Sequence, residues 1–318
     1  MPVKKFIFHF SMKEIIGYIR EHFKETNKPV LILTTALTAM LIWLNYANAL
    51  EERLTTNEDL LWSAFTGHYF ISFFAFFLPY LFYVVVERKS FFQNKLFLLL
   101  LVVAPAIFSL KMSLNPRLFF SANGDWNNYW NQVNYWPSLF IIVLAIVFLL
   151  WWMLDRNNQP LYGVTTKNLK CQPYILMLLI MIPLIAAAST QPDFLHTYPK
   201  LKSVLHIEGD IKFKWWHKLI FELSYGSDFF SIELFFRGFL ILAFIKYAGR
   251  AAILPMACFY CTIHFGKPLG ECISSYFGGM LLGIVVYNTK SIYGGLMVHL
   301  GIAWLMEIGG YIGNAASS

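Results

Sequence analysis

Ser231-Ile-Glu-Leu-Phe-Phe-Arg-Gly238 places a carboxylate and a guanidinium inside an apolar run that extends over residues 219–248. Glu233 and Arg237 are four residues apart, so a helix puts both side chains on one face. A charged side chain costs roughly 2.5–3.5 kcal/mol at the centre of a membrane-spanning helix, which makes such a pair a sign of function. The alternative interpretation is a structural ion pair that locks two helices together.

The composition of the whole chain agrees with a membrane location for this run. Of the 318 residues, 58% are apolar and 18% aromatic, and only 14% are charged, which is far more hydrophobic than a soluble protein. The net charge of +7 comes mainly from short basic segments between apolar runs, a pattern typical of membrane topology signals rather than of nucleic-acid binding. We therefore expect an all-α, polytopic protein of the cell membrane, surrounded by the lipid bilayer and with no nucleic-acid partner.

The order of apolar and polar segments divides the chain into four parts. Residues 1–28 form an amphipathic segment with basic flanks, which we place on the cytoplasmic surface. Residues 29–190 hold the N-terminal transmembrane helices, 191–218 form a polar connecting loop, and 219–318 contain four closely spaced apolar segments. We expect about eight or nine transmembrane helices, depending on whether the short glycine-rich segments cross fully, and the last four form the expected catalytic core.

Neither the cysteines nor the histidines of the connecting loop form a recognisable metal motif. The four cysteines lie in or beside apolar runs and are interpreted as buried thiols. His196, His206 and His217 follow one another at ten and eleven residues, which fits no common ligand spacing. We therefore expect these three histidines at the surface.

Two further histidines lie in the last apolar segments. His264 ends the segment 251–264 and precedes a stretch rich in glycine and proline, where irregular backbone can line a polar cavity. His299 lies well inside the segment 292–308. Together with Glu233, three separate apolar segments each contribute one ionisable side chain of a kind used in hydrolysis.

One carboxylate and two imidazoles can cut a peptide bond with water. Glu233 would accept a proton from the water, His264 would orient the water, and His299 would donate to the tetrahedral oxygen. Arg237 would support the site as the partner of Glu233. Two histidines and a glutamate can equally hold Zn²⁺ with an open fourth position. These residues leave the choice open, so we assign no metal ligand or cofactor and keep a metalloendopeptidase-like zinc site as the alternative.

The order of these motifs resembles that of the CPBP family of intramembrane proteases, also known as the CAAX protease and bacteriocin-processing, or Abi, family. The family pattern has Glu-Glu-x-x-x-Arg on one helix, Phe-x-x-x-His ending the next, and His-x-x-x-Asn/Asp on a later one. The corresponding stretches are Ile232-Glu-Leu-Phe-Phe-Arg237, Tyr260-Cys-Thr-Ile-His264 and His299-Leu-Gly-Ile-Ala303. The resemblance implies a multipass helical fold and an intramembrane protease with Glu233, His264 and His299 in its site.

Two positions depart from the family pattern. The first glutamate, which the family uses as the base, is Ile232, and the Asn/Asp after the last histidine is Ala303. Another carboxylate would then have to take over the missing role. The other acids that we consider in this half of the chain lie at no motif position: Asp228, Glu271 and Glu307.

The sequence thus predicts an intramembrane endopeptidase of the CAAX-protease type that cleaves membrane-associated proteins or peptides. A prenylated substrate is not assigned. The alternative is a catalytically inactive relative that acts as a membrane scaffold, a chaperone or a bacteriocin self-immunity factor. A transporter that uses the same polar residues as an ion path is disfavoured, because the chain shows no internal repeat of fixed period.

Overall fold

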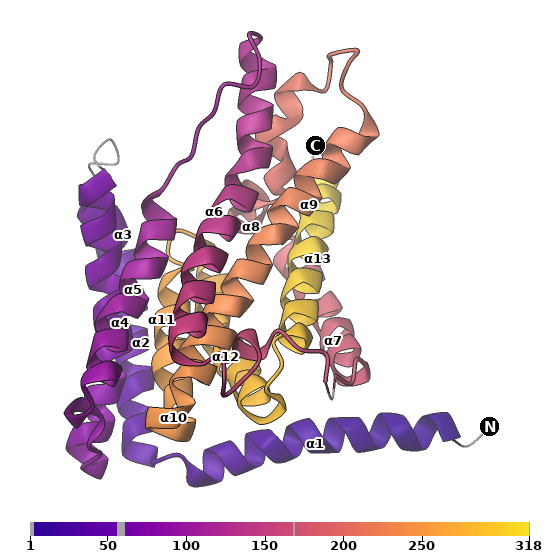
Figure 1. Ribbon diagram of the computed structural model, residues 1–318. Coiled ribbons are helices and arrows are strands. Elements are labelled where there is room, and N and C mark those ends of the chain that lie inside the picture. Colours follow the sequence, from indigo (N-terminus) through magenta and orange to yellow (C-terminus); the bar gives the residue numbers. More distant parts are fainter. Residues whose placement is uncertain (1–2, 56–60, 168, 318) are drawn as a thin grey trace. The chain divides into compact units, whose positions relative to one another are not determined.

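The computed structural model describes residues 3–55, 61–167 and 169–317, and its regular elements in these ranges are all helices. The prediction of an all-α protein is therefore confirmed. In chain order (Figure 1) the elements are α1 (Val3–Glu25), α2 (Lys28–Asn48), α3 (Leu50–Thr55), α4 (Leu61–Glu87), η1 (Phe91–Gln93), α5 (Lys95–Ser113), α6 (Gly124–Leu154), η2 (Leu161–Gly163), α7 (Gln172–Ala188), α8 (Pro192–Thr197), η3 (Lys200–Ile207), α9 (Trp215–Ile232), η4 (Glu233–Ala243), α10 (Ile245–Ala248), η5 (Gly249–Ala252), α11 (Ile253–Thr262), α12 (Leu269–Thr289) and α13 (Tyr293–Ser317).

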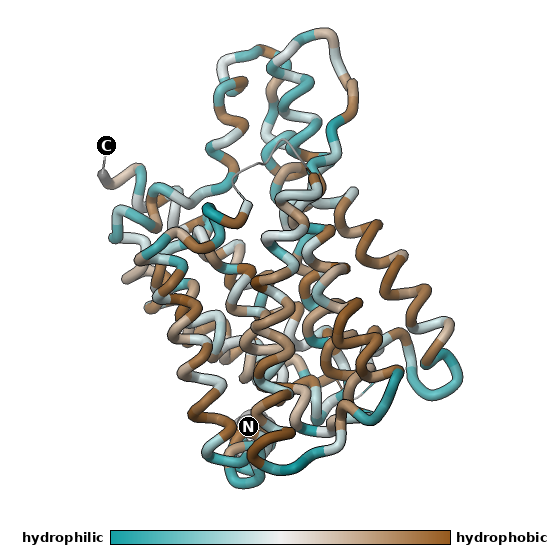
Figure 2. The backbone as a smooth tube through the Cα atoms, turned by 90° about the vertical axis from the view of Figure 1, so that its left-hand side faces the viewer, coloured by the Kyte–Doolittle hydropathy of each residue, from teal (hydrophilic) through white to brown (hydrophobic). Residues whose placement is uncertain are grey.

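Within the described ranges, six helices are long and apolar enough to cross a membrane: α2, α4, α5, α6, α12 and α13. Helix α7 is also apolar but has only 17 residues. Figure 2 shows hydrophobic residues along the long helices and hydrophilic residues in many of the turns that join them. The chain is therefore a multi-pass membrane protein, as its composition predicts.

Two apolar segments that we counted as further spans have a more broken structure. Segment 219–247 lies in α9, the π-helix η4 and the short α10, and segment 251–264 holds the ten-residue α11. Gly249 separates these two segments and has a φ of 55°, a backbone conformation that residues other than glycine rarely adopt. Long π-helices are rare, and π-turns are frequent at functional sites. The change from α9 to the π-helix η4 at Glu233 therefore makes Glu233 a candidate functional residue.

The chain divides into two compact units, each assembled from three stretches. The first unit comprises residues 1–114, 146–169 and 234–293, and the second comprises residues 115–145, 170–233 and 294–318. The boundary passes through η4 between Glu233 and Leu234. Glu233 and His299 therefore belong to the second unit, whereas Arg237 and His264 belong to the first.

Buried aromatic rings form the core of the first unit. Phe76 and Tyr80 of α4 and Phe97 of α5 surround Phe244, with ring centroids 5.3, 6.2 and 5.7 Å from it. Farther along α5, Phe108 packs on the rings of η4. Aromatic contacts of this kind stabilise by about 0.5–1.5 kcal/mol each beyond the area they bury. They fix η4, and with it Arg237, within the first unit.

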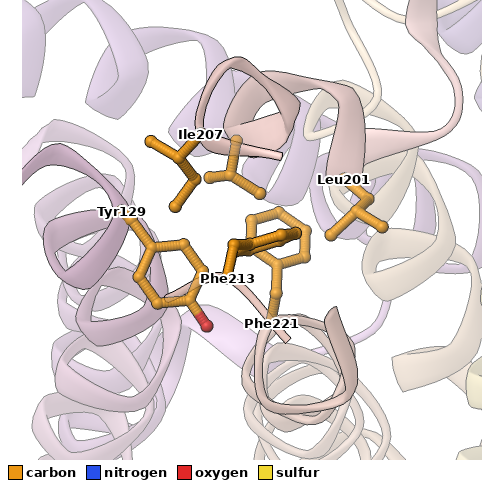
Figure 3. Close-up of a cluster of buried hydrophobic side chains, with 6 residues drawn as sticks. Tyr129, Leu201, Ile207, Phe213 and Phe221 are labelled. Atoms are coloured by element: carbon orange, nitrogen blue, oxygen red, sulfur yellow. The ribbon is translucent and has the colours of Figure 1, made fainter. Parts of the chain in front are cut away.

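The core of the second unit lies where the start of α6, η3 and α9 meet (Figure 3). Its buried side chains are Tyr129, Leu201, Val204, Ile207, Phe213 and Phe221. Segment 191–218, expected as a connecting loop, thus contains α8 and η3 and supplies much of this core.

The expected surface position of His217 is wrong, because this side chain is buried in the second unit. Its ring stacks on Phe213 with centroids 5.3 Å apart, and its Nδ1 accepts a hydrogen bond of 2.9 Å from the Lys214 amide. Tyr129 donates a hydrogen bond of 2.8 Å to the His217 carbonyl. An aromatic cage and a helix start hold this histidine, which spacing within the chain could not reveal.

Adjacent glycines in α12 give a matched test of the packing between α11 and α12. A Cβ at Gly279 would lie 2.7 Å from Cδ1 of Tyr260, whereas a Cβ at Gly278 would meet nothing within 4 Å. We expect Gly279→Ala to destabilise by about 1–3 kcal/mol through overpacking, and Gly278→Ala to stabilise by up to about 1 kcal/mol through helix propensity. Denaturant unfolding in mild detergent measures both; equal stability of the two variants would contradict this packing.

Candidate functional site

The second unit brings Glu233 and His299 together. Oε1 of Glu233 lies 3.0 Å from Nδ1 of His299, and the glutamate is fully buried while the imidazole is 13% exposed. A carboxylate can only accept a hydrogen bond, so Nδ1 of His299 carries the hydrogen and donates the hydrogen bond to Glu233. In the neutral imidazole Nε2 is then the nitrogen that accepts a proton. The pair has the geometry of a carboxylate that orients a histidine base.

Glycine and phenylalanine shape the space around this pair. A Cβ at Gly295 would lie only 2.5 Å from Oε2 of Glu233, so the glycine lets the carboxylate approach α13. The ring of Phe229 packs edge-on against the His299 ring, with centroids 4.8 Å apart. The spacing of residues in the chain could not predict this contact between a glycine and the carboxylate.

The first unit holds Arg237 and His264 around Tyr260. The guanidinium of Arg237 is fully buried and lies over the Tyr260 ring, with Cζ 3.9 Å from the centroid. The ring of His264 lies 4.7 Å from the same tyrosine ring, and its Nδ1 donates a 3.0 Å hydrogen bond to the Tyr260 carbonyl. A carbonyl can only accept, so the neutral His264 ring also has Nε2 as its accepting nitrogen. Tyr260 therefore positions both the cation and the imidazole.

The four residues singled out in the sequence thus form two pairs, one in each unit. Glu233 pairs with His299 in the second unit, and Arg237 and His264 share Tyr260 in the first. The ion pair between Glu233 and Arg237 stays a prediction. Zinc binding also stays a prediction; among the described residues, no group of three or more His, Cys, Asp or Glu has an arrangement suited to a metal ion.

Asp228, Glu271 and Glu307, the other acids considered in this half, have partners that explain them structurally. Asp228 accepts a 3.0 Å hydrogen bond from the Ser231 hydroxyl, and Glu271 forms a 2.9 Å ion pair with Lys267 one turn earlier. Glu307 accepts the Lys200 amide at 2.8 Å, at the start of η3. These contacts favour roles in holding the fold over a role as a catalytic base.

The two departures from the expected motifs are buried apolar side chains. Ile232 is 8% exposed and Ala303 is 3% exposed, both within the second unit. Neither can accept or donate a proton. Any proton transfer at this site therefore depends on Glu233, on the two histidines, or on a residue outside the motifs.

The fold and these pairs define a multi-pass, all-α membrane protein with a buried carboxylate–imidazole couple. Residues 223–305 match the family model Rce1-like, described as Type II CAAX prenyl endopeptidase Rce1-like. This segment, which contains Glu233, Arg237, His264 and His299, is an Rce1-like domain of the CAAX-protease family. The family resemblance expected from the motifs is therefore confirmed for this domain. Comparison with curated proteins and with solved structures gave no match.

A double-mutant cycle tests the bond between Glu233 and His299. A hydrogen bond to a charged group contributes about 1.5–3 kcal/mol, so we expect Glu233→Gln and His299→Ala each to lower the free energy of unfolding by about that amount. Because Glu233→Gln removes the charge of the acceptor and His299→Ala removes the donor of the same bond, the double variant should fall short of additivity by about 0.5–3 kcal/mol. Denaturant unfolding in detergent measures the cycle, with the exposed His196 replaced by alanine as a neutral control. Full additivity would show that the two side chains do not interact.

Proposed function

We propose that this protein is an intramembrane endopeptidase of the CAAX-protease type, which hydrolyses peptide bonds of membrane-associated proteins or peptides. The observation that carries the proposal is the 3.0 Å hydrogen bond between Glu233 and His299 inside a domain that matches an endopeptidase family. The proposed location is the cell membrane, in line with the apolar helices. The match leaves open whether the substrates carry a prenyl group.

The proposed reaction uses the two histidines through their Nε2 atoms. His264 orients a water molecule, and the Glu233–His299 couple holds the proton that the water loses as its oxygen attacks the peptide carbonyl carbon. The imidazolium form of His299 then donates to the negatively charged oxygen of the tetrahedral intermediate. Collapse of this intermediate breaks the C–N bond, and a proton passes to the leaving amine. Glu233 supports this cycle because a carboxylate on Nδ1 stabilises the imidazolium.

The buried guanidinium of Arg237 has a positioning role in this proposal. It is fully buried, and its packing on Tyr260 fixes the residue whose carbonyl accepts from His264. Replacement of Arg237 would therefore act on catalysis through Tyr260 and His264.

Cleavage of a membrane-embedded peptide tests the proposed activity. The purified protein in lipid nanodiscs should cut a fluorogenic transmembrane peptide. Glu233→Gln, His264→Ala and His299→Ala should each lower kcat/KM at least about a hundredfold, because general acid–base groups contribute about 10²–10⁴-fold. The exposed His206, replaced by alanine, serves as the control. Cleavage at the wild-type rate by all three variants would refute the proposed site.

Chelation separates the water-activating mechanism from a zinc-dependent one. In the proposed mechanism no cofactor takes part, so incubation with 1,10-phenanthroline should leave the cleavage rate of wild-type protein unchanged. A rate that falls with chelator and returns with added Zn²⁺ would instead assign Glu233, His264 and His299 to a metal site.

The second candidate function, an inactive relative that serves as a scaffold or self-immunity factor, has its support in Ile232 and Ala303. Both are buried and apolar where the family pattern has polar groups. Under this alternative, neither wild-type protein nor the Glu233→Gln variant cleaves peptides. The two proteins therefore give the same fragment pattern with a library of membrane peptides. Fragments produced only by the wild type would exclude it.

A further inference from the structure

A second carboxylate–imidazole pair lies in the first unit, outside every motif of the matched domain. Glu51 belongs to the short α3 that follows α2, and His68 lies two turns into α4. Oε1 of Glu51 is 3.7 Å from Nδ1 of His68, and the side chains are only 20% and 13% exposed. At this distance the two groups interact electrostatically rather than through a hydrogen bond.

The backbone around Glu51 is held tightly. Its amide donates a 3.0 Å hydrogen bond to Oδ1 of Asn45, and its carbonyl accepts a 2.8 Å bond from the Thr55 hydroxyl. On the α4 side, a Cβ at Gly67 would lie 2.2 Å from the Leu54 carbonyl oxygen, so α3 presses directly on α4. The direction of the Glu51 side chain is therefore set by α2 and α4 together.

This direction brings Glu51 to the turn that carries His264. Oε2 of Glu51 lies 3.6 Å from the position that a Cβ of Gly266 would occupy, two residues after His264. Gly266 has a φ of 74°, and the turn is closed by the Lys267 amide, which donates to the His264 carbonyl at 3.2 Å. The Tyr46 hydroxyl at the end of α2 donates to the Lys267 carbonyl. The end of α2 thus fastens both α3 and the turn after His264.

The charges around Glu51 leave its carboxyl able to hold a proton near neutral pH. Burial raises the pKa of Glu51 to about 7. The described charged groups of the neighbouring elements are His68 on α4 and the Lys267–Glu271 ion pair, in which the ammonium already faces a carboxylate at 2.9 Å. A carboxylic acid of this strength can protonate a leaving amine, a step that an ordinary exposed glutamate performs poorly at neutral pH.

We propose that Glu51, held by His68, is a further catalytic residue beside the turn that follows His264 and acts as the general acid. This inference rests on the proposed function. As the tetrahedral intermediate collapses, the C–N bond breaks and the Glu51 carboxyl gives its proton to the amine nitrogen. Glu51 then takes up a proton from solvent, and the Glu233–His299 couple releases to solvent the proton that it took from water, so each turnover consumes one water and no other reactant.

Two substrates separate an acid role from a structural one. Peptide hydrolysis needs a protonated leaving amine, whereas a p-nitrophenyl ester of the same acyl segment leaves without a proton. We expect Glu51→Gln to lower kcat/KM for the membrane peptide at least about tenfold and to leave ester hydrolysis within about twofold of wild type. The neighbouring Glu52, which is exposed, is replaced by glutamine as the control and should change neither rate.

The pH profile gives the second measurement. The acid form of Glu51 is the active one, so wild-type peptide cleavage should fall as pH rises through about 7, and this alkaline limb should disappear in Glu51→Gln. Glu51→Asp keeps a carboxyl at a shorter reach, so it should retain the limb at a lower rate.

The outcomes distinguish this inference from the function on which it rests. If Glu51→Gln cleaves the peptide at the wild-type rate with the wild-type pH profile, while His264→Ala does not, Glu51 has no catalytic role and the proposed function stands. If Glu51→Gln loses peptide and ester hydrolysis equally, its role is structural and the acid assignment is wrong. A wild-type protein that cuts no peptide overturns both proposals.

Discussion

Burial of the Arg237 guanidinium is the constraint on which the arrangement of the first unit depends. Removal of a cation from water has a penalty of several kcal/mol, which the surrounding groups must offset. The face of Tyr260, 3.9 Å from Cζ, contributes a desolvated cation–π contact of about 2 kcal/mol. This contact requires an immobile tyrosine, and Gly279 of α12 allows the close packing that holds it. Because the Tyr260 carbonyl also accepts from His264, the same packing orients the imidazole.

In both units, the hydrogen-bond partner of Nδ1 determines the tautomer of a histidine. An acceptor-only group occupies Nδ1 in each case: the Glu233 carboxylate for His299 and the Tyr260 carbonyl for His264. Nε2 is thereby made the basic nitrogen of both rings. The partners differ in charge, so the two histidines are not equivalent. His299 pairs with a carboxylate and His264 with a neutral carbonyl.

The sequence predicted the helical membrane fold from its long apolar runs, and the CAAX-protease family from the resemblance of its motifs. Charge in an apolar run is expensive and therefore conspicuous. Glu233, Arg237, His264 and His299 stand out for this reason alone. Contacts between distant segments could not be predicted in this way. The closeness of Gly295 to a carboxylate, for example, depends on how α13 packs against Glu233. Glu51 did not stand out in the sequence, because it lies in a short acidic stretch that is typical of an ordinary external loop. His217 looked like a loop residue because the helix start and aromatic cage around it form only on folding.

The partner of each acid decides what that acid can do. An ammonium, as at Glu271, forms an ion pair that ties the acid to the preceding turn. Backbone amides, as at Glu307, tie the acid to a helix start. An imidazole differs because it can itself take up or release a proton near neutral pH, so a carboxylate beside it becomes part of a proton path. Glu233 and Glu51 have such partners, one in each unit, and their surroundings differ: Glu233 is fully buried in a close hydrogen bond, whereas Glu51 is partly exposed at a longer distance.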